Sequence, residues 1–558
     1  MSIEPTFSLL YPPGFSKQSE PVMDRGFAAD LSAQTLFNIM KSAARFKPTA
    51  VNPLEYLTAQ PEVILHRLDL IDELIQNEAL YRMLAKLLPE LEDMKDLFTR
   101  ENAVNEDAEQ SMYTVSEIEF FTNSIDKLYA FFSSGEGTVR SVGMKSLSGK
   151  IIGIAESDSY QQLKAASSKV GQTIRNVKSI TVGVNLNSQL MPIDASVVSI
   201  NTEVFKTGNL IDKLFRGNGK DDPYYCLSPL EMVGKGISQD DAMTFKRAVN
   251  STLNKHFKDS VKSWKPAIRL FTKSESRFLV QLADDIRFLL GGATLVKKLM
   301  ELGVPVCKPQ VVDKTERAMD VKQLYNPAYV LGAEPAQAGQ SVASLVFNDF
   351  RFDEQGIIYI FTGPNQGGKS MFTKAVGLAQ MMFQLGLFVP AKQAAISPVD
   401  QLLTHFPLST QNQDHSRFEE ECQRLMEQIR KLTRHSMLLM DETFSSTSAA
   451  EATHIAEQVL KGLRGVGCRI IFATHLHELA GKIDELNAQD EQGSRIDSLI
   501  AELRENADGS GTRSYAVSRS RPQSNSFARD IAEKYGLTYE GLLACFPKEA
   551  YARAGTAE

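Results

Sequence analysis

A glycine-rich turn that closes on a lysine and a serine is the clearest sign of chemistry in this chain of 558 residues. Four residues separate Gly363 from Gly368, Lys369 and Ser370. In this P-loop spacing, backbone N–H groups cradle phosphate oxygens, the lysine adds positive charge and the hydroxyl binds Mg²⁺. We therefore predict a nucleotide site. Its predicted contacts are Gly363, Pro364, Asn365, Gln366, Gly367, Gly368, Lys369, Ser370 and Met371.

A strand and a helix must hold such a loop in place. Residues 357–361 are β-branched or aromatic, which is typical of a buried strand. Residues 371–387 are apolar on one side and lack proline, so they predict a helix that begins near Lys369. The positive end of its dipole would then point at the phosphate. This order favours a nucleotide site over a glycine turn that merely joins a strand to a helix.

An acidic pair follows a second apolar stretch. Residues 437–440 predict a strand, and Asp441 and Glu442 come directly after it. Ligands bind at the carboxyl ends of strands in open α/β sheets, so both acids should lie near the P-loop. We predict that Asp441 holds Mg²⁺, as Ser370 does, and that Glu442 orients or deprotonates the attacking water.

Two further polar groups have both a simple and a functional interpretation. His475 follows a predicted strand at 469–473 and could contact the γ-phosphate, or it could be an ordinary core histidine. Ser416 precedes a predicted helix that runs to about Leu432, so it could cap that helix, contact phosphate, or do both. A metal site built from His475 and His477 is not favoured, because no other ligand cluster accompanies them.

The composition is that of an ordinary soluble, cytoplasmic protein. Hydrophobic residues make up 43%, charged residues 23%, and the net charge is -7. The sequence shows neither a secretory signal nor an apolar run long enough to cross a bilayer, so no membrane association is expected. The five scattered cysteines fit a reducing cytosol and argue against a disulfide framework or a zinc site.

The rest of the chain alternates in character. Residues 1–50 are punctuated by prolines and predict loose structure, whereas apolar residues recur at helical spacing from about residue 54 and again at 278–302. Alternating β-formers around a polar turn predict a strand pair at 177–205.

A basic segment between residues 245 and 277 has two interpretations. Its apolar residues recur every four positions, while Lys255, Lys258 and Lys262 fall on a different face. Many solvated helices have such a face, and this is the simpler interpretation. The alternative is contact with a phosphate backbone by counterion release.

Four blocks together resemble the ATPase domain of the MutS family of DNA mismatch-repair proteins: GPNQGGKS, HSRF, LLMDETFSSTS and FATHLHEL. The resemblance is close from about residue 348 to 479 and weaker to 539, and residues 57–84 are similar to the start of the family's helical core. It implies an α/β P-loop ATPase domain, ABC-like in architecture, C-terminal to a mainly α-helical core and lever domain with a small clamp-like insertion. The implied parts are an N-terminal segment (1–50), the helical core and lever (51–325, with the clamp at about 180–265), the ATPase domain (326–540) and a C-terminal tail (541–558).

The resemblance also implies a composite active site in a homodimer. The P-loop nucleotide of one subunit would be completed by Ser416 of the other, with Asn365 on the terminal phosphate and His475 as a switch histidine. ATP and Mg²⁺ are the implied cofactors, and Lys369, Glu442 and His475 the implied catalytic residues. ATP would hold two subunits together around DNA, and hydrolysis would release them.

The chain departs from the family pattern in places. The family usually has Met at Gln366, Thr at Met371, a Ser-Thr-Phe run at 416–418 and a Gly-Arg-Gly-Thr-Ser turn at 444–448. The Phe-x-Glu motif by which members wedge a ring beside a mispair is not found before the ATPase domain, nor is a C-terminal nuclease domain expected. This favours binding to distorted, branched or mismatched DNA without the known wedge.

The leading hypothesis is an ATP-gated clamp on DNA in mismatch repair or recombination, with possible downstream repair proteins as partners. A MutS-like ATPase that acts on ribosomes or RNA is the alternative. A transporter ATPase is disfavoured because the Leu-Ser-Gly-Gly-Gln signature is missing. A small-molecule kinase would not explain Ser416, His475 and the C-terminal helices together.

Overall fold

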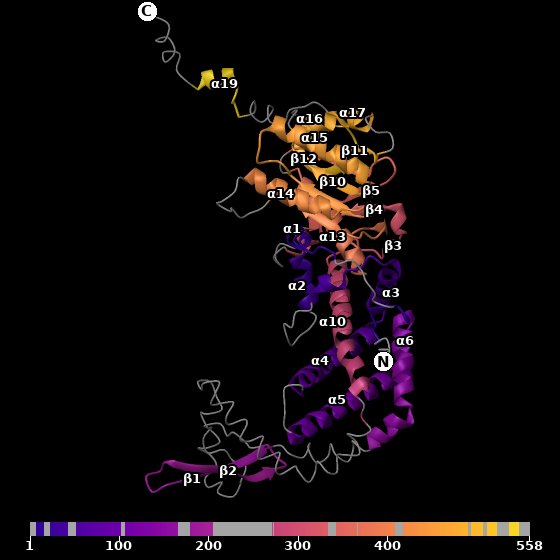
Figure 1. Ribbon diagram of the computed structural model, residues 1–558, viewed down its shortest axis with the longest axis vertical. Coiled ribbons are helices and arrows are strands. Elements are labelled where there is room, and N and C mark those ends of the chain that lie inside the picture. The colour runs from indigo at the N-terminus through magenta and orange to yellow at the C-terminus, as the bar shows by residue number, and fades with distance from the viewer. Residues whose placement is uncertain are drawn as a thin grey trace, which may run out of the picture. The chain divides into compact units, whose positions relative to one another are not determined.

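The computed structural model describes residues 7–15, 23–42, 52–101, 107–165, 179–204, 271, 273–332, 342–364, 367–407, 417–488, 493–505, 511–521 and 535–545 (Figure 1). The predicted contacts Asn365, Gln366 and Ser416 lie outside these residues. So does most of the basic segment, including Lys255, Lys258 and Lys262. Predictions about these positions therefore remain predictions from the sequence.

The chain divides into two compact units. The first comprises Met1–Ser16, Ala43–Thr49 and Glu73–Leu290. The second comprises Lys17–Ser42, Ala50–Asp72 and Gly291–Glu558. Residues 291–325, which the sequence grouped with the helical core, thus pack within the unit that carries the P-loop. In the described residues no helix is both long enough and apolar enough to span a membrane.

Long helices build most of the described part of the first unit, as the apolar spacing predicted for the first and last of them. They are α4 (Glu78–Glu101), α5 (Asp107–Ser133), α6 (Val142–Ala155) and most of α10 (Lys273–Glu301), with a short 3₁₀ turn at Gly135–Gly137. Helices α4 and α6 both pack against α5. Arg287 of α10 forms a mostly buried ion pair of 2.8 Å with Glu92 of α4, which ties the first and last of these helices together.

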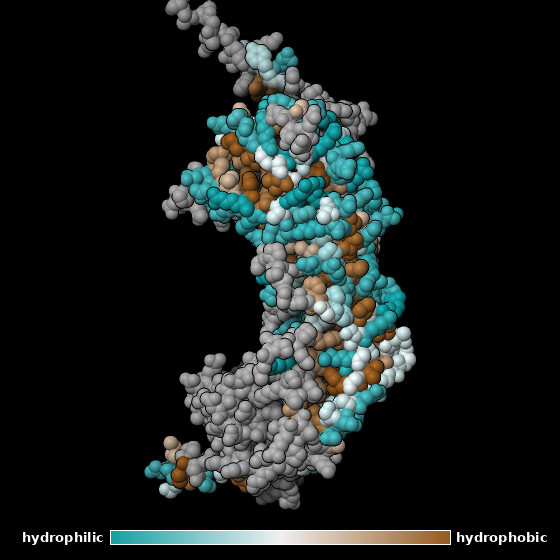
Figure 2. Space-filling view, turned by 45° about the vertical axis from the view of Figure 1, so that its right-hand side comes forward, coloured by the Kyte–Doolittle hydropathy of each residue, from teal (hydrophilic) through white to brown (hydrophobic). Residues whose placement is uncertain are grey.

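The strand pair predicted at 177–205 is confirmed. Strands β1 (Ser179–Leu186) and β2 (Pro192–Asn201) run antiparallel around a polar turn. Several large apolar side chains of this hairpin are exposed, and Figure 2 shows hydrophobic and hydrophilic residues side by side there, at the lower left. They are Leu186, Leu190, Met191, Ile193 and Val198.

A six-stranded sheet forms the centre of the second unit, in the order β12-β11-β6-β10-β9-β8. The strands are β6 (Ile358–Thr362), β8 (Leu402–His405), β9 (Met437–Asp441), β10 (Arg469–Ala473), β11 (Ile496–Glu505) and β12 (Gly511–Ser518). All neighbouring pairs are parallel except β11 and β12. Strands β6, β9 and β10 are buried along their whole length, because helices cover the sheet.

Besides this sheet, the second unit contains helices of different lengths. The longest are α3 (Pro61–Gln76, which continues into the first unit), α13 (Lys369–Gln384), α14 (Arg417–Arg430) and α15 (Ala449–Val466). Shorter ones are Pro53–Tyr56, Lys314–Glu316, α11 (Pro327–Leu331), α16 (His477–Gly481), α17 (Ile483–Ala488) and α19 (Tyr539–Ala544). Helix α13 contacts both β9 and β10, and α14 contacts β8.

A smaller sheet and an N-terminal segment complete the second unit. The sheet has the order β3-β7-β4-β5, with strands Gln310–Val311, Gln393–Ile396, Met319–Leu324 and Asn348–Phe352. Where loose structure was predicted within residues 1–50, two helices form, α1 (Phe27–Asp30) and α2 (Gln34–Ser42). The prediction was wrong there, because local proline content says nothing of tertiary partners. The Thr404 hydroxyl of β8, for example, donates a 2.6 Å hydrogen bond to Asp30.

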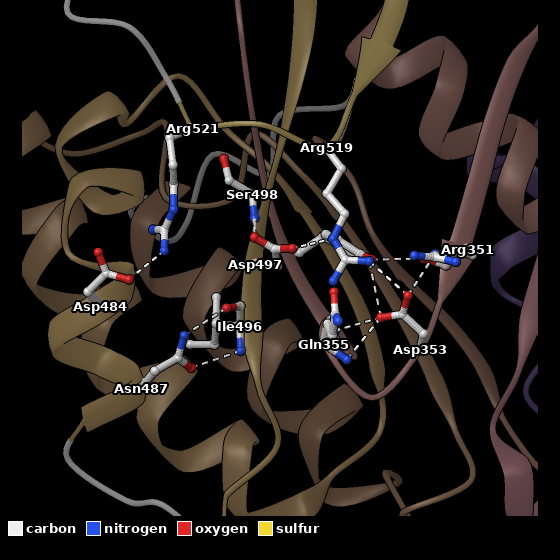
Figure 3. Close-up of polar contacts among 12 residues, drawn as sticks. Arg351, Asp353, Gln355, Asp484, Asn487, Ile496, Asp497, Ser498, Arg519 and Arg521 are labelled. Carbon is white, nitrogen blue, oxygen red and sulfur yellow. Dashed lines mark hydrogen bonds and ion pairs between the residues drawn. The ribbon is translucent and has the colours of Figure 1, made fainter.

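An arginine at the end of β12 fastens the antiparallel edge of the large sheet (Figure 3). The guanidinium of Arg519 pairs with Asp353, at 2.9 Å, and with Asp497. Burial alone would lower the pKa of Arg519, but these two carboxylates raise it above its usual range. Asp353 lies shortly before β6, and Asp497 lies at the start of β11. Since the amino ends of β6 and β11 are opposite to the P-loop end, this network stabilises the sheet without entering the candidate site.

Candidate nucleotide site

Three parallel strands bring the predicted catalytic groups to the same end of the large sheet, where the carboxyl ends of these strands lie. Strand β10 pairs with β6 on one side and β9 on the other, and Ala473 lies level with both Phe361 and Asp441. Two hydrogen bonds extend the pairing beyond the strands. Thr474 N–H donates to Phe361 O and Glu442 N–H donates to Ala473 O, each at 2.9 Å. The P-loop, the acidic pair and the Thr474–His475 pair therefore all leave the sheet at the same end.

The P-loop backbone needs glycine at both of its ends. Gly363 has φ +144°, and a Cβ there would lie 2.7 Å from the Cβ of Ala501 on β11. Gly368 has φ +94° and precedes the first residue of α13. Side-chain-bearing residues rarely adopt such angles. The turn therefore leads directly into α13, which begins at Lys369 as predicted.

Lys369 is folded back over its own loop. Its ammonium group donates hydrogen bonds to the carbonyl oxygens of Gly363, at 3.0 Å, and Pro364, at 3.2 Å. Only 4% of the residue is exposed. Burial lowers the pKa of Lys369, while the charges of Glu442 and Asp441 act in the opposite direction. The lysine is thus already close to both acids.

Asp441 has the environment expected of a metal ligand. Its Oδ1 atom is buried and has no hydrogen-bond partner. Burial raises the pKa of Asp441, and a hydrogen bond from the Ser370 side chain partly offsets this. An unpaired carboxylate oxygen beside a serine hydroxyl, at the mouth of a phosphate loop, fits Mg²⁺, which prefers oxygen ligands. The predicted metal ligands Ser370 and Asp441 are therefore together.

Glu442 stands at the start of a strained turn. Its φ is +49° and that of Phe444 is +68°, although neither residue is glycine. Left-handed backbone of this kind costs about 1–3 kcal/mol per residue and persists only where neighbouring groups fix it. Glu442 is half-buried, its backbone N–H is bonded to β10, and its charge acts on both Asp441 and Lys369.

The two histidines lie in the same neighbourhood. His475 is exposed, so the core-histidine interpretation does not hold for it. Burial lowers the pKa of His477, and the charges of Lys369 and His475 add to this effect. Among the described residues no group of three or more potential metal ligands gathers. Met371 is 43% exposed on the first turn of α13.

Two residues of this site carry no signal in the sequence. Tyr515 of β12 has φ +57° and is 45% exposed. Its Cδ1 lies 3.2 Å from where a Cβ on Gly368 would stand, so an aromatic ring borders the P-loop. Glu421 of α14 bonds to the turn after Glu442, by hydrogen bonds to Phe444 and Ser446. Both contacts join residues far apart in the chain, which spacing alone cannot predict.

Comparisons with known proteins agree with the motifs. Residues 359–536 match the family model of MutS domain V. Proteins named "DNA mismatch repair protein MutS" are similar to parts of the chain. The one from Thermosipho melanesiensis is 29% identical over 313 residues, which is 54% of this chain and 36% of that protein. The one from Chloroflexus aurantiacus is 31% identical over 247 residues, 42% of this chain and 24% of that protein.

A third relative, from Brevibacillus brevis, is 34% identical over 145 residues, 25% of this chain and 17% of that protein. The resemblance to the MutS family is therefore confirmed. The alignments span between 17% and 36% of the length of these relatives. Sequence and comparison agree most directly on the unit that carries the P-loop.

Proposed function

We propose that this chain is an ATPase whose affinity for DNA depends on the nucleotide that it binds. The proposal rests on one observation: Lys369, Asp441 and Glu442 lie together at the carboxyl end of the large sheet. A phosphate loop, a metal-fitting carboxylate and a second acid are the parts that phosphoryl transfer to water requires. The match of residues 359–536 to MutS domain V supports it further.

The residues divide the work by position. Lys369 exchanges the carbonyl oxygens of Gly363 and Pro364 for phosphate oxygens of ATP, and the N–H groups at the start of α13 bind the same anion. Ser370 and Asp441 would hold Mg²⁺, which offsets the negative charge of the phosphates. Glu442 orients the attacking water and accepts its proton, and His475 contacts the terminal phosphate.

The site is completed by a second copy of the chain. In this proposal Ser416 of one subunit contacts the nucleotide of the other, and Asn365 contacts the terminal phosphate. Neither half-site alone supplies enough positive charge and hydrogen-bond donors to stabilise the transferring phosphoryl group. ATP therefore favours the dimer, and hydrolysis releases it.

The proposed substrate of the clamp is mismatched, branched or otherwise distorted DNA. The relatives' printed name, DNA mismatch repair protein MutS, supports a role in mismatch repair or recombination. The helical unit, its hairpin and the basic segment would form the DNA-binding part, and ATP binding would change its affinity for DNA.

The test is the steady-state ATPase rate with a panel of homoduplex, mismatched, branched and single-stranded DNA. Stimulation by mismatched or branched DNA at matched nucleotide concentration is expected. ATPase activity that responds to RNA or ribosomes but to no DNA would replace this proposal with the alternative. A protein that binds no ATP would overturn it.

A further inference from the structure

The turn that follows Glu442 is held by one carboxylate of helix α14. Glu421 accepts two hydrogen bonds there, each 2.6 Å long. One comes from the backbone N–H of Phe444 and the other from the hydroxyl of Ser446. The ring of Phe418, one turn earlier on α14, packs near that of Phe444 with centroids 6.3 Å apart. Helix and turn therefore meet through both polar and apolar contacts.

A buried histidine makes a second link between the same elements. His405 ends β8 and is 1% exposed. Its Nε2 lies 3.2 Å from the backbone carbonyl of Glu421, and its Nδ1 lies 2.9 Å from the hydroxyl of Thr443. A carbonyl can only accept, so Nε2 carries the proton and donates. Since burial keeps the ring neutral near pH 7, Nδ1 then accepts from Thr443. The residue after Glu442 is thus also bonded, through His405, to α14.

These links act on backbone that would not hold its shape alone. Glu442 and Phe444 both have positive φ, and Thr443 between them is 1% exposed. Hydrogen bonds to a charged acceptor are stronger than neutral ones, which suits Glu421 to hold strained backbone. Moving α14 would change the turn, and with it the direction of the Glu442 carboxylate.

We propose that Glu421 and Thr443 are positioning residues that set the Glu442 carboxylate for hydrolysis, so that α14 transmits its position to the hydrolytic acid of its own chain. This inference rests on the proposed function. Helix α14 begins at Arg417, directly after Ser416, which the proposed function assigns to the partner's nucleotide. Nucleotide bound in one composite site would therefore influence hydrolysis in the other.

The first experiment compares Glu421→Ala with Glu421→Gln and with Glu427→Ala, which removes the same charge from an exposed position of the same helix. Affinity for a non-hydrolysable ATP analogue and kcat are measured for the full chain. Glu421→Ala should leave the affinity within about twofold and lower kcat about tenfold, equivalent to about 1.4 kcal/mol. Glu421→Gln keeps one acceptor oxygen and should fall between, while Glu427→Ala should match wild type.

A conservative pair tests the histidine link. Thr443→Val keeps the shape but removes the hydroxyl, and should lower kcat, whereas Thr443→Ser should restore it. Hydrogen–deuterium exchange supplies a readout that does not depend on turnover. The Phe444 amide should exchange faster in Glu421→Ala and at the wild-type rate in Glu427→Ala.

The outcomes separate the two proposals. Wild-type protein that hydrolyses ATP while Glu421→Ala keeps its kcat would overturn the inference and leave the proposed function standing. A fall in analogue affinity that accounts for the whole loss of activity would also overturn it, because the residue would then serve binding. Wild-type protein without ATP binding would overturn both.

Discussion

The Lys369 ammonium group donates a 3.0 Å hydrogen bond to the carbonyl oxygen of Gly363, six residues earlier in the same loop. The buried ammonium group thus finds hydrogen-bond acceptors within its own loop. ATP must offer better acceptors than these carbonyls. Phosphate oxygens do so, because a charged acceptor roughly doubles the strength of the bond.

Lys369→Ala should abolish nucleotide binding. The variant loses the positive charge that phosphate would meet and leaves two carbonyl oxygens of the loop without their donor. Binding of a fluorescent ATP analogue measures the effect, and Lys392→Ala, at an exposed lysine of the same unit, is the control. Retained affinity in Lys369→Ala would contradict the assigned site.

Glu442→Ala should bind ATP but nearly stop turnover. Its carboxylate is assigned to the attacking water, so its loss should affect kcat by about 10²–10⁴-fold and binding little. Glu442→Gln keeps the side-chain size and should behave alike. Single-turnover hydrolysis separates chemistry from release, and a rate near that of wild type would remove the assigned role.

Mixed dimers test whether the site is shared. Homodimers of Lys369→Ala and of Ser416→Ala should both be inactive. A dimer with one chain of each kind contains one site with both residues intact, supplied by different chains, and one site with neither. Such a dimer should therefore regain activity that neither homodimer has, whereas an inactive mixture would argue against sharing.

Charge reversal of the basic segment tests the DNA-binding part of the proposal. The triple variant Lys255→Glu, Lys258→Glu and Lys262→Glu should bind DNA more weakly and with a shallower salt dependence. The slope of log K against log salt should shrink by about 0.9 for each phosphate of duplex DNA that the variant no longer neutralises.

A matched control reverses three exposed lysines elsewhere, Lys41, Lys145 and Lys392. It changes the net charge equally without altering the basic segment. Equal slopes for both triple variants and wild type would favour the solvated-face interpretation.

His405 should make stability depend on pH. Burial, with the nearby Arg424 charge, lowers its pKa from 6.5 to about 4. Between these pH values the unfolded chain binds a proton that the folded chain does not. The contribution of His405 to the free energy of unfolding is therefore complete above pH 6.5 and is lost as the pH falls toward 4. The slope should reach about 1.4 kcal/mol per pH unit. Denaturant unfolding of wild type and His405→Asn measures it, and an identical pH dependence would contradict the assignment.

The proposed chemistry and the local elements can both be derived from the sequence alone. The P-loop letters, the acidic pair and the strand before His475 each predicted a type of element and a polar end, because side-chain periodicity and glycine placement are local properties. The hairpin at β1 and β2 and the helix after Lys369 followed for the same reason.

Which of these strand ends meet depends on the tertiary structure. Parallel pairing of β10 with both β6 and β9 brings Asp441 level with Ala473 and Phe361, although the three are far apart in sequence. The contacts of Glu421 and His405 with the turn after Glu442, and the packing of α1 on β8, depend on the same long-range pairing. No spacing rule encodes them, since burial and hydrogen bonding between distant segments are properties of the folded chain.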